Sequence, residues 1–79
     1  MHLQTEHRHW EAYVRPLAEK NGLLWDIKTN YGNETILAVL VHPAHSDKGL
    51  SVDVDRAYNS EKAIKHKIHL AINKLVSLQ

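Results

Sequence analysis

The chain contains no cysteine, and only two of its 79 residues are proline and three are glycine. Without cysteine it cannot form disulfides, thiolate zinc sites or a thiol nucleophile. The low proline and glycine content, with 43 % hydrophobic and 24 % charged residues, excludes a disordered tail. We therefore expect one folded domain over residues 1–79, because a chain of this length has room for a single core.

Neither charge nor hydrophobicity is extreme. Ten basic residues against nine acidic ones leave a net charge of +1, which excludes a protein that binds through bulk positive charge. The longest wholly apolar run, Ile36–Val41, is far shorter than the roughly 20 residues that a membrane helix needs. The first seven residues are too polar for a signal peptide, so we expect a cytoplasmic protein with no membrane segment.

Two segments have the spacing of amphipathic helices. The first runs from about Thr5, a suitable N-cap, to Asn21, where Asn21-Gly22 provides a stop. Pro16 either kinks this helix or splits it, and the apolar stripe that continues through it favours one kinked helix. The second segment, Ser60–Leu78, has a single apolar stripe made of Ile64, Ile68, Ala71, Ile72, Leu75 and Leu78.

Three segments between the helices have strand patterns. Residues 23–30 and 50–55 alternate between apolar and polar side chains, whereas residues 35–42 are apolar on both faces, as in a central strand. A turn at residues 30–33 and a loop at residues 43–49 connect them. Short connections favour an antiparallel meander, so we predict an α+β two-layer sandwich of order α-β-β-β-α, with both helices on one face of the sheet.

A sheet that is covered on one face leaves its other face open. The outer strands place polar side chains there, namely Asp26, Lys28, Ser51, Asp53 and Asp55, but the middle strand has apolar residues on both sides. We therefore predict a homodimer or protein-partner interface within Ile36, Leu37, Ala38, Val39, Leu40 and Val41. The alternative is a stripe partly shielded by long neighbours such as Lys28 or by the N-terminal segment.

The positive charge is concentrated in the last helix. Residues 57–79 contain four lysines and one acid, whereas residues 1–56 have a balance of −2. One interpretation is an ordinary solvated helix face. The alternative is a nucleic-acid site whose candidate residues are Lys62, Lys65, His66, Lys67, His69 and Lys74.

The element order and the start of the last helix resemble those of double-stranded RNA-binding domains. In that family the helix begins Ser-Lys-Lys-x-Ala-Lys, and here the stretch reads Ser60-Glu61-Lys62-Ala63-Ile64-Lys65. The resemblance implies phosphate contacts from this helix across a major groove. The chain departs from the family at Glu61, and its 30–34 loop lacks the Gly-Pro-x-His that enters the minor groove.

Seven histidines raise the question of a metal site. The close pairs offer only two ligands each where a closed site needs four: His42 with His45, His66 with His69, and Asp53 with Asp55. No serine lies in a Gly-x-Ser-x-Gly setting, and no glycine-rich phosphate loop exists. We predict a non-enzymatic protein with no metal, cofactor or catalytic residue. A histidine metal site remains the alternative.

Overall fold

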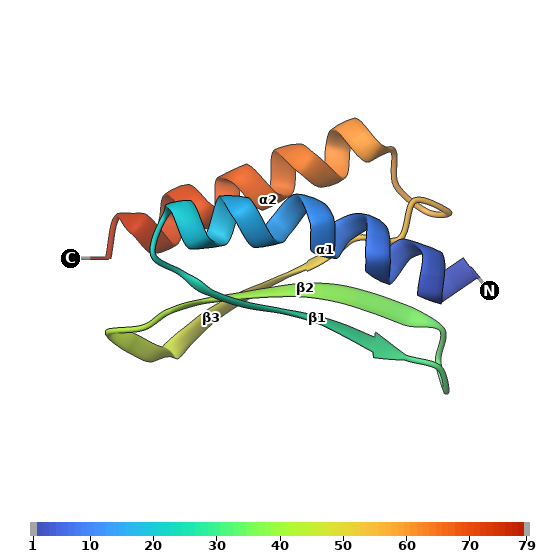
Figure 1. The fold of residues 1–79 in the computed structure, drawn as a ribbon, viewed down its shortest axis with the longest axis horizontal. Helices are drawn as coiled ribbons and strands as arrows, with labels where there is room; N and C mark the ends of the chain where they lie inside the picture. Colours follow the sequence, from blue (N-terminus) through green and yellow to red (C-terminus); the bar gives the residue numbers. More distant parts are fainter. Residues whose placement is uncertain (1, 79) are drawn as a thin grey trace.

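Five elements follow one another in the order helix, strand, strand, strand, helix (Figure 1). The computed structural model describes residues 2–78; Met1 and Gln79, the ends of the predicted domain, lie outside the described residues. The elements are α1 (His2–Lys20), β1 (Leu24–Asn30), β2 (Thr35–His42), β3 (His45–Asp53) and α2 (Glu61–Val76). The predicted α-β-β-β-α order is confirmed.

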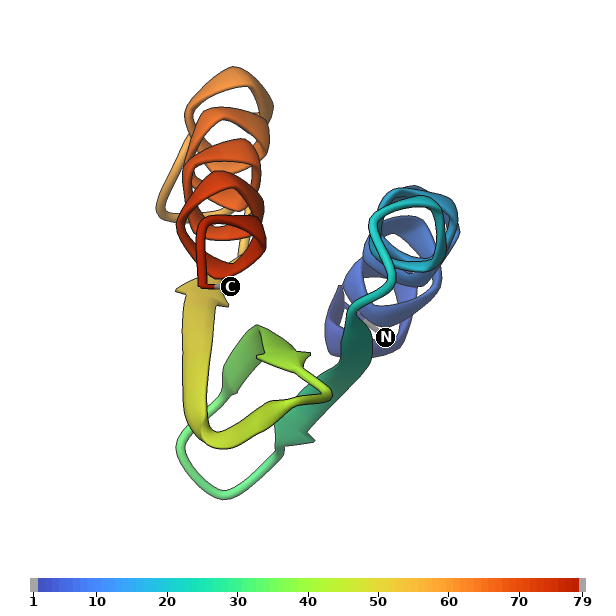
Figure 2. The same ribbon diagram turned by 90° about the vertical axis from the view of Figure 1, so that its left-hand side faces the viewer.

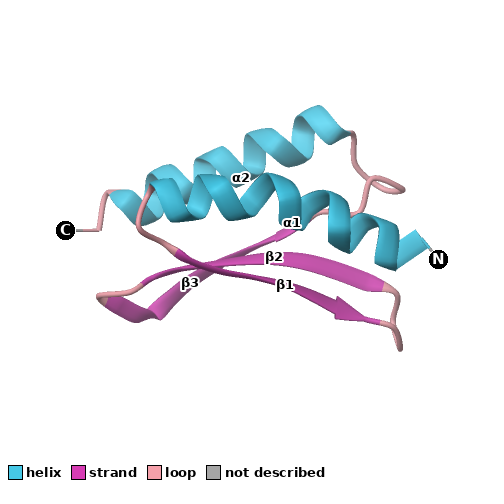
Figure 3. Cartoon of the chain, viewed as in Figure 1, coloured by secondary structure: helices cyan, strands magenta, loops and turns pink. Residues whose placement is uncertain are grey.

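The three strands form one antiparallel sheet in the order β1-β2-β3. Both helices pack on the same face of this sheet, with α1 above β1 and α2 above β3 (Figure 2). The helices start at the same end of the molecule and run side by side in one direction (Figure 3). The opposite face of the sheet is covered by no helix or strand of the described chain.

The core lies between the helices and the sheet, and it contains most of the predicted apolar stripe of each helix. Trp10 is completely buried, and its ring contacts Tyr13 edge to face. The sheet contributes Ile27, Val52 and one set of β2 side chains. Within residues 2–78, no helix is long and apolar enough to span a bilayer.

Helix α1 begins at His2, whereas the sequence predicts a start at a Thr5 cap, three residues later. The helix continues unbroken through Pro16. The earlier start arises because Leu3 packs into the core. At the other end, the N–H of Gly22 bonds the Glu19 carbonyl and the N–H of Leu23 bonds the Ala18 carbonyl. Gly22 has a positive φ of 69°, so the predicted stop at Asn21-Gly22 is confirmed with the hydrogen bonds of a glycine C-cap.

Strand β3 is longer than the sequence pattern predicts, which corrects the expected 43–49 loop. Only Pro43 and Ala44 form the turn, and residues 45–49 already belong to the strand. These residues are polar and lie on a sheet edge, so they lack the apolar alternation that predicts a strand. His45 and Gly49 pair with His42 and Val41 of β2, and the register shift at Val41/His42 leaves residues 46–48 bulged between these two pairs.

Helix α2 is capped by Ser60, whose Oγ accepts the N–H of Ala63 at 3.1 Å. It ends at Val76 rather than Leu78, and Ser77 is its C-cap.

In the turn between β1 and β2, the residue with a positive φ is Glu34, at 54°, and not the glycine or an asparagine of the turn.

We expect Pro16→Ala to stabilise the protein, because proline deletes one hydrogen bond inside α1 and alanine restores it. Part of this gain is offset because alanine gives the unfolded chain more conformational entropy than proline does. The free energy of unfolding should therefore rise by about 1 to 2 kcal/mol. Chemical denaturation measures this change. Arg8→Ala, an exposed change in the same helix, is the control and should alter it by less than about 0.5 kcal/mol. A destabilised Pro16→Ala would contradict the expectation.

Candidate functional site

The open face of the sheet is the first candidate site, and its apolar centre comes from β2. Alternation along this strand buries Ile36, Ala38 and Leu40 completely against the helices. These three residues of the predicted interface are therefore core residues and not surface residues. The remaining three, Leu37, Val39 and Val41, lie on the open face and are partly exposed. The sequence could not decide between the two sets, because both are equally apolar.

The neighbouring strands frame this stripe in three rows set by the strand register. Leu37 lies between Lys28 and Asp53, Val39 lies between Asp26 and Ser51, and Val41 lies between Leu24 and Gly49. Leu24 enlarges the apolar area, since 56 % of it is exposed. The face thus has an apolar centre with charged side chains beside it.

The charged side chains of the open face have no ion-pair partners among residues 2–78. No acidic group lies within 4.0 Å of the Lys28 ammonium, and no basic group lies that close to Asp26 or Asp53. Asp53 Oδ1 accepts the N–H of Asp55 at 3.0 Å, which orients this carboxylate without neutralising it. These charges therefore remain available to a partner.

The second candidate site, the cationic helix α2, does not form one continuous patch. Lys65 and His69 lie on the flank that faces α1: the Lys65 ammonium lies 4.8 Å from the centre of the Tyr13 ring, and the Tyr13 hydroxyl lies 2.8 Å from His69 Nε2. Lys67 and Lys74 lie on the other flank, beside β3. Lys62 and His66 are exposed. The six predicted residues are thus divided between two flanks and the outer surface of the helix.

An ion pair between a buried carboxylate and a partly exposed arginine joins α1 to the segment after β3, and the sequence did not predict it. Glu6 is 2 % exposed, and its carboxylate accepts four hydrogen bonds from Arg56. Three come from the guanidinium, the shortest at 2.6 Å, and one comes from the backbone N–H at 2.9 Å. These hydrogen bonds hold the pKa of Glu6 below its ordinary value, against the opposing effect of burial.

A signal for this pair was present in the sequence. Glu6 occupies the same helical stripe as Leu3, Trp10, Val14 and Ala18, where an acidic side chain must be buried. A buried carboxylate requires a cationic or hydrogen-bonding partner. The identity of that partner could not be read from the sequence, because Arg56 is 50 residues away.

Glu61, in the first turn of α2, extends this ion pair into a small network. It lies 3.1 Å from Arg56, 3.1 Å from Lys65 and 3.1 Å from His9. Lys65, followed by Arg56, lowers the pKa of Glu61. The position at which the resemblance to RNA-binding domains expects a lysine is therefore occupied by the acid that ties α2 to Arg56 and α1.

The sequence analysis expects Asp55 on the open face beside Asp53, and this expectation is wrong. Asp55 is buried. It lies after β3, and its Oδ1 bonds His2 Nε2 at 2.7 Å and the N–H of Ala57 at 2.9 Å. Among residues 2–78, one group of three potential metal ligands lies close together: His2, Glu6 and Asp55. Because Arg56 engages both oxygens of Glu6, this group is better described as part of the ion-pair network.

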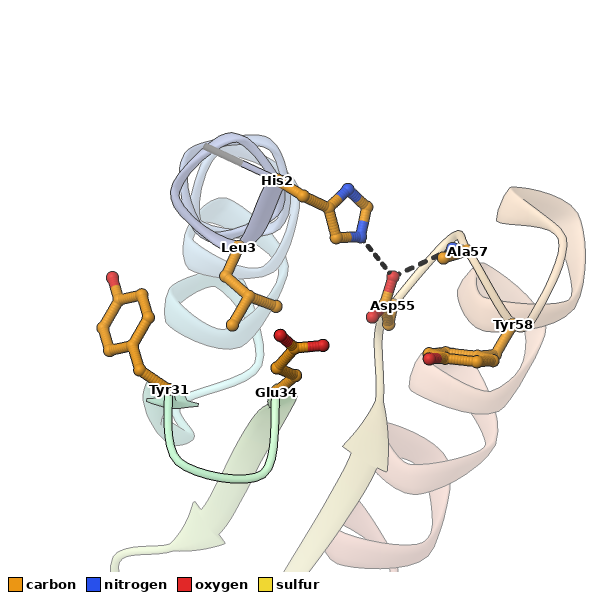
Figure 4. Close-up of a pocket in the computed structure, with 7 residues that line it drawn as sticks. All are labelled: His2, Leu3, Tyr31, Glu34, Asp55, Ala57 and Tyr58. Carbon is orange, nitrogen blue, oxygen red and sulfur yellow. Dashed lines mark hydrogen bonds and ion pairs between the residues drawn. The ribbon is translucent and has the colours of Figure 1, made fainter.

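An open pocket of about 420 Å³ lies beside this network, at the end of the molecule where both helices begin (Figure 4). Its walls include two tyrosines that are largely exposed, Tyr31 from the β1–β2 turn and Tyr58 from the segment before α2. Glu34 points into the space between them, toward Asp55. The ionisable side chains of the lining, apart from the two tyrosines, are Glu34, Asp55 and His2, and His2 is hydrogen-bonded to Asp55.

The predicted histidine pairs acquire no further ligands in the structure. The rings of His42 and His45 are 5.1 Å apart across the β2–β3 turn, and His42 Nδ1 accepts the N–H of Ala44. His69 bonds Tyr13 while His66 is exposed. Among residues 2–78, neither pair belongs to a group of three or more potential ligands.

No protein-family model, curated protein or solved structure matches this chain. The assignment of a function therefore depends on the geometry of the two surfaces and of the ion-pair network.

We expect Glu6→Gln to lower the free energy of unfolding by about 2 to 3 kcal/mol near neutral pH, since a charged acceptor of four hydrogen bonds is lost. The lowered pKa of Glu6 means that its contribution is complete above about pH 4.5 and disappears as the pH falls through the folded-state value. Denaturation from pH 7 to pH 3 should therefore show a steeper loss in the wild type than in Glu6→Gln. Glu61→Gln, at an exposed member of the network, is the control and should have a smaller effect. Parallel pH profiles for the wild type and Glu6→Gln would contradict this account.

Proposed function

We propose that the protein is a cytoplasmic, non-enzymatic interaction module that self-associates through the open face of its sheet. The observation that carries this proposal is the partly exposed stripe of Leu37, Val39 and Val41, at the centre of a face that no helix or strand within residues 2–78 covers. Exposed apolar area framed by charges is typical of a protein–protein contact. A second copy of the chain is a suitable occupant, because a small domain gains stability by burying such a face.

The two edge strands, β1 and β3, carry charges that favour contact through the open face rather than through the sheet edges. Both edge strands carry charged residues, including Asp26 and Lys28 on β1 and Asp47 and Lys48 on β3. Charges on an edge disfavour strand addition. A three-stranded face is small, so we expect micromolar or weaker association.

We expect Val39→Lys to abolish self-association, because it places a charge at the centre of the apolar stripe, where two copies meet. The dissociation constant should rise by about 100-fold or more, while the circular dichroism spectrum stays unchanged. Light scattering between about 10 µM and 1 mM measures the mass. Ala12→Lys, which adds the same charge on the exposed side of α1, is the control. A wild-type protein that stays monomeric at 1 mM would contradict the proposal.

A second candidate function, nucleic-acid binding by α2, is favoured by one observation. Lys62, Lys67 and Lys74 have no acidic group within 4.0 Å among residues 2–78, so their charges are available to phosphates. The pairing of Lys65 with Glu61 and the division of the cations between two flanks reduce the continuous positive area. This makes it the weaker of the two candidates.

We expect this second function to give salt-dependent binding to an RNA duplex of about 16 base pairs. In an NMR titration, shifts confined to residues 60–74 should disappear when salt is raised to about 0.2 M. The double variant Lys62→Ala/Lys67→Ala should remove them, whereas Lys20→Ala at the end of α1 should not. Unchanged spectra at low salt would exclude this function.

A further inference from the structure

We propose that two copies pack open face against open face with their β2 strands parallel, so that Lys28 of each copy lies opposite Asp53 of the other. This inference rests on the proposed self-association and adds the orientation of the second copy. The orientation is inferred from the register of the three strands.

The register places Lys28, Leu37 and Asp53 in one row across the sheet, with opposite charges at the two ends of the row. Consider a two-fold axis that lies between the two faces and runs along β2. Rotation about it places β1 of one copy over β3 of the other and keeps each row at its own level. Lys28 then faces Asp53 of the second copy, and the symmetry produces this pair twice.

The same rotation matches the other two rows. The Asp26–Val39–Ser51 row places Asp26 opposite a serine, and the Leu24–Val41–Gly49 row places Leu24 opposite the glycine. At Gly49 the side chain of the facing leucine meets no Cβ, which leaves room for it. Leu37, Val39 and Val41 each meet their own counterparts, which gives a continuous apolar centre. Face-to-face sheets packed with aligned strands commonly have this arrangement.

An antiparallel arrangement satisfies the face less completely. A two-fold axis that runs across the strands places β1 over β1 and β3 over β3. When the axis passes through the Val39 row, Asp26 lies opposite Asp26; when it passes through the Leu37 row, Lys28 lies opposite Lys28 and Asp53 opposite Asp53. Like charges held at an interface oppose association. When the axis lies between these two rows, Lys28 lies opposite Asp26, but Val41 then lies opposite Thr35 and Leu24 lies opposite Asn30. The parallel arrangement therefore combines opposite charges with a continuous apolar centre, whereas these antiparallel arrangements do not.

The charges needed for the cross-pairs are not used inside one copy. Lys28 and Asp53 belong to no ion pair among residues 2–78. Lys67 of α2 lines the same groove as Asp53, at the outer edge of β3, but does not approach its carboxylate within 4.0 Å. Each cross-pair would therefore form without breaking an existing one.

Charge reversal tests the cross-pairs directly. Lys28→Asp and Asp53→Lys should each raise the dissociation constant of the dimer by roughly tenfold or more, because each turns two attractive pairs into two repulsive ones. The double variant Lys28→Asp/Asp53→Lys restores opposite charges and should return within about threefold of the wild type. Lys20→Asp, at the exposed end of α1, is the control for net charge and should have no effect. Sedimentation equilibrium measures the dissociation constants of the wild type and of the four variants.

The outcomes separate this inference from the proposed function. If Val39→Lys dissociates the dimer while neither single charge reversal weakens it, the face is the interface but the parallel arrangement is wrong. A double variant as weak as the single variants would also overturn the cross-pairs. A wild type that is monomeric at 1 mM would overturn both the inference and the proposed function.

Cross-linking gives a readout that does not depend on affinity, and the absence of native cysteine makes single-cysteine variants selective. Facing sheets lie about 10 Å apart, so a bis-maleimide that spans about 8 Å can join facing side chains. In the parallel arrangement, Leu37→Cys and Val41→Cys should each cross-link to their own counterpart. In the antiparallel arrangement centred on Val39, these two variants would cross-link only when mixed, which would overturn the proposal.

Discussion

The constraint on which the structure depends is that two helices cover only one face of a three-stranded sheet whose middle strand is apolar on both faces. Burial of Ile36, Ala38 and Leu40 against α1 and α2 builds the core. The same alternation leaves Leu37, Val39 and Val41 on the uncovered face. The core cannot form without presenting this stripe, so the open face is a direct consequence of how the chain folds.

The ion pair between Glu6 and Arg56 sets the position of α1 relative to the segment that leads into α2. A carboxylate that is almost fully buried is tolerated because four hydrogen bonds satisfy it. Glu61 connects the same arginine to the first turn of α2, so one network joins the starts of both helices to the end of the sheet. This network gives Glu61 a structural role at the position where a phosphate-binding lysine is expected from the resemblance to RNA-binding domains.

In the proposed dimer, the specificity of the open face comes from the strand register rather than from hydrophobicity. An apolar stripe alone would accept many partners and orientations. Because Lys28 and Asp53 flank the same leucine on opposite strands, the parallel arrangement combines two opposite-charge pairs with apolar side chains that meet their own counterparts. The same charges would keep the separate subunits soluble and would disfavour random stacking.

The sequence by itself determined the element order, the meander and the stop of the first helix at Asn21-Gly22, because these follow from local periodicity and local backbone chemistry. It also limited the candidate interface to residues 36–41, since no other run is apolar on both faces. Only the tertiary structure decided which half of that run is exposed, because two apolar sets on one strand are equivalent until the helices cover one of them. The partner of Glu6 likewise depends on a contact between residues 50 positions apart, which no local sequence pattern reveals.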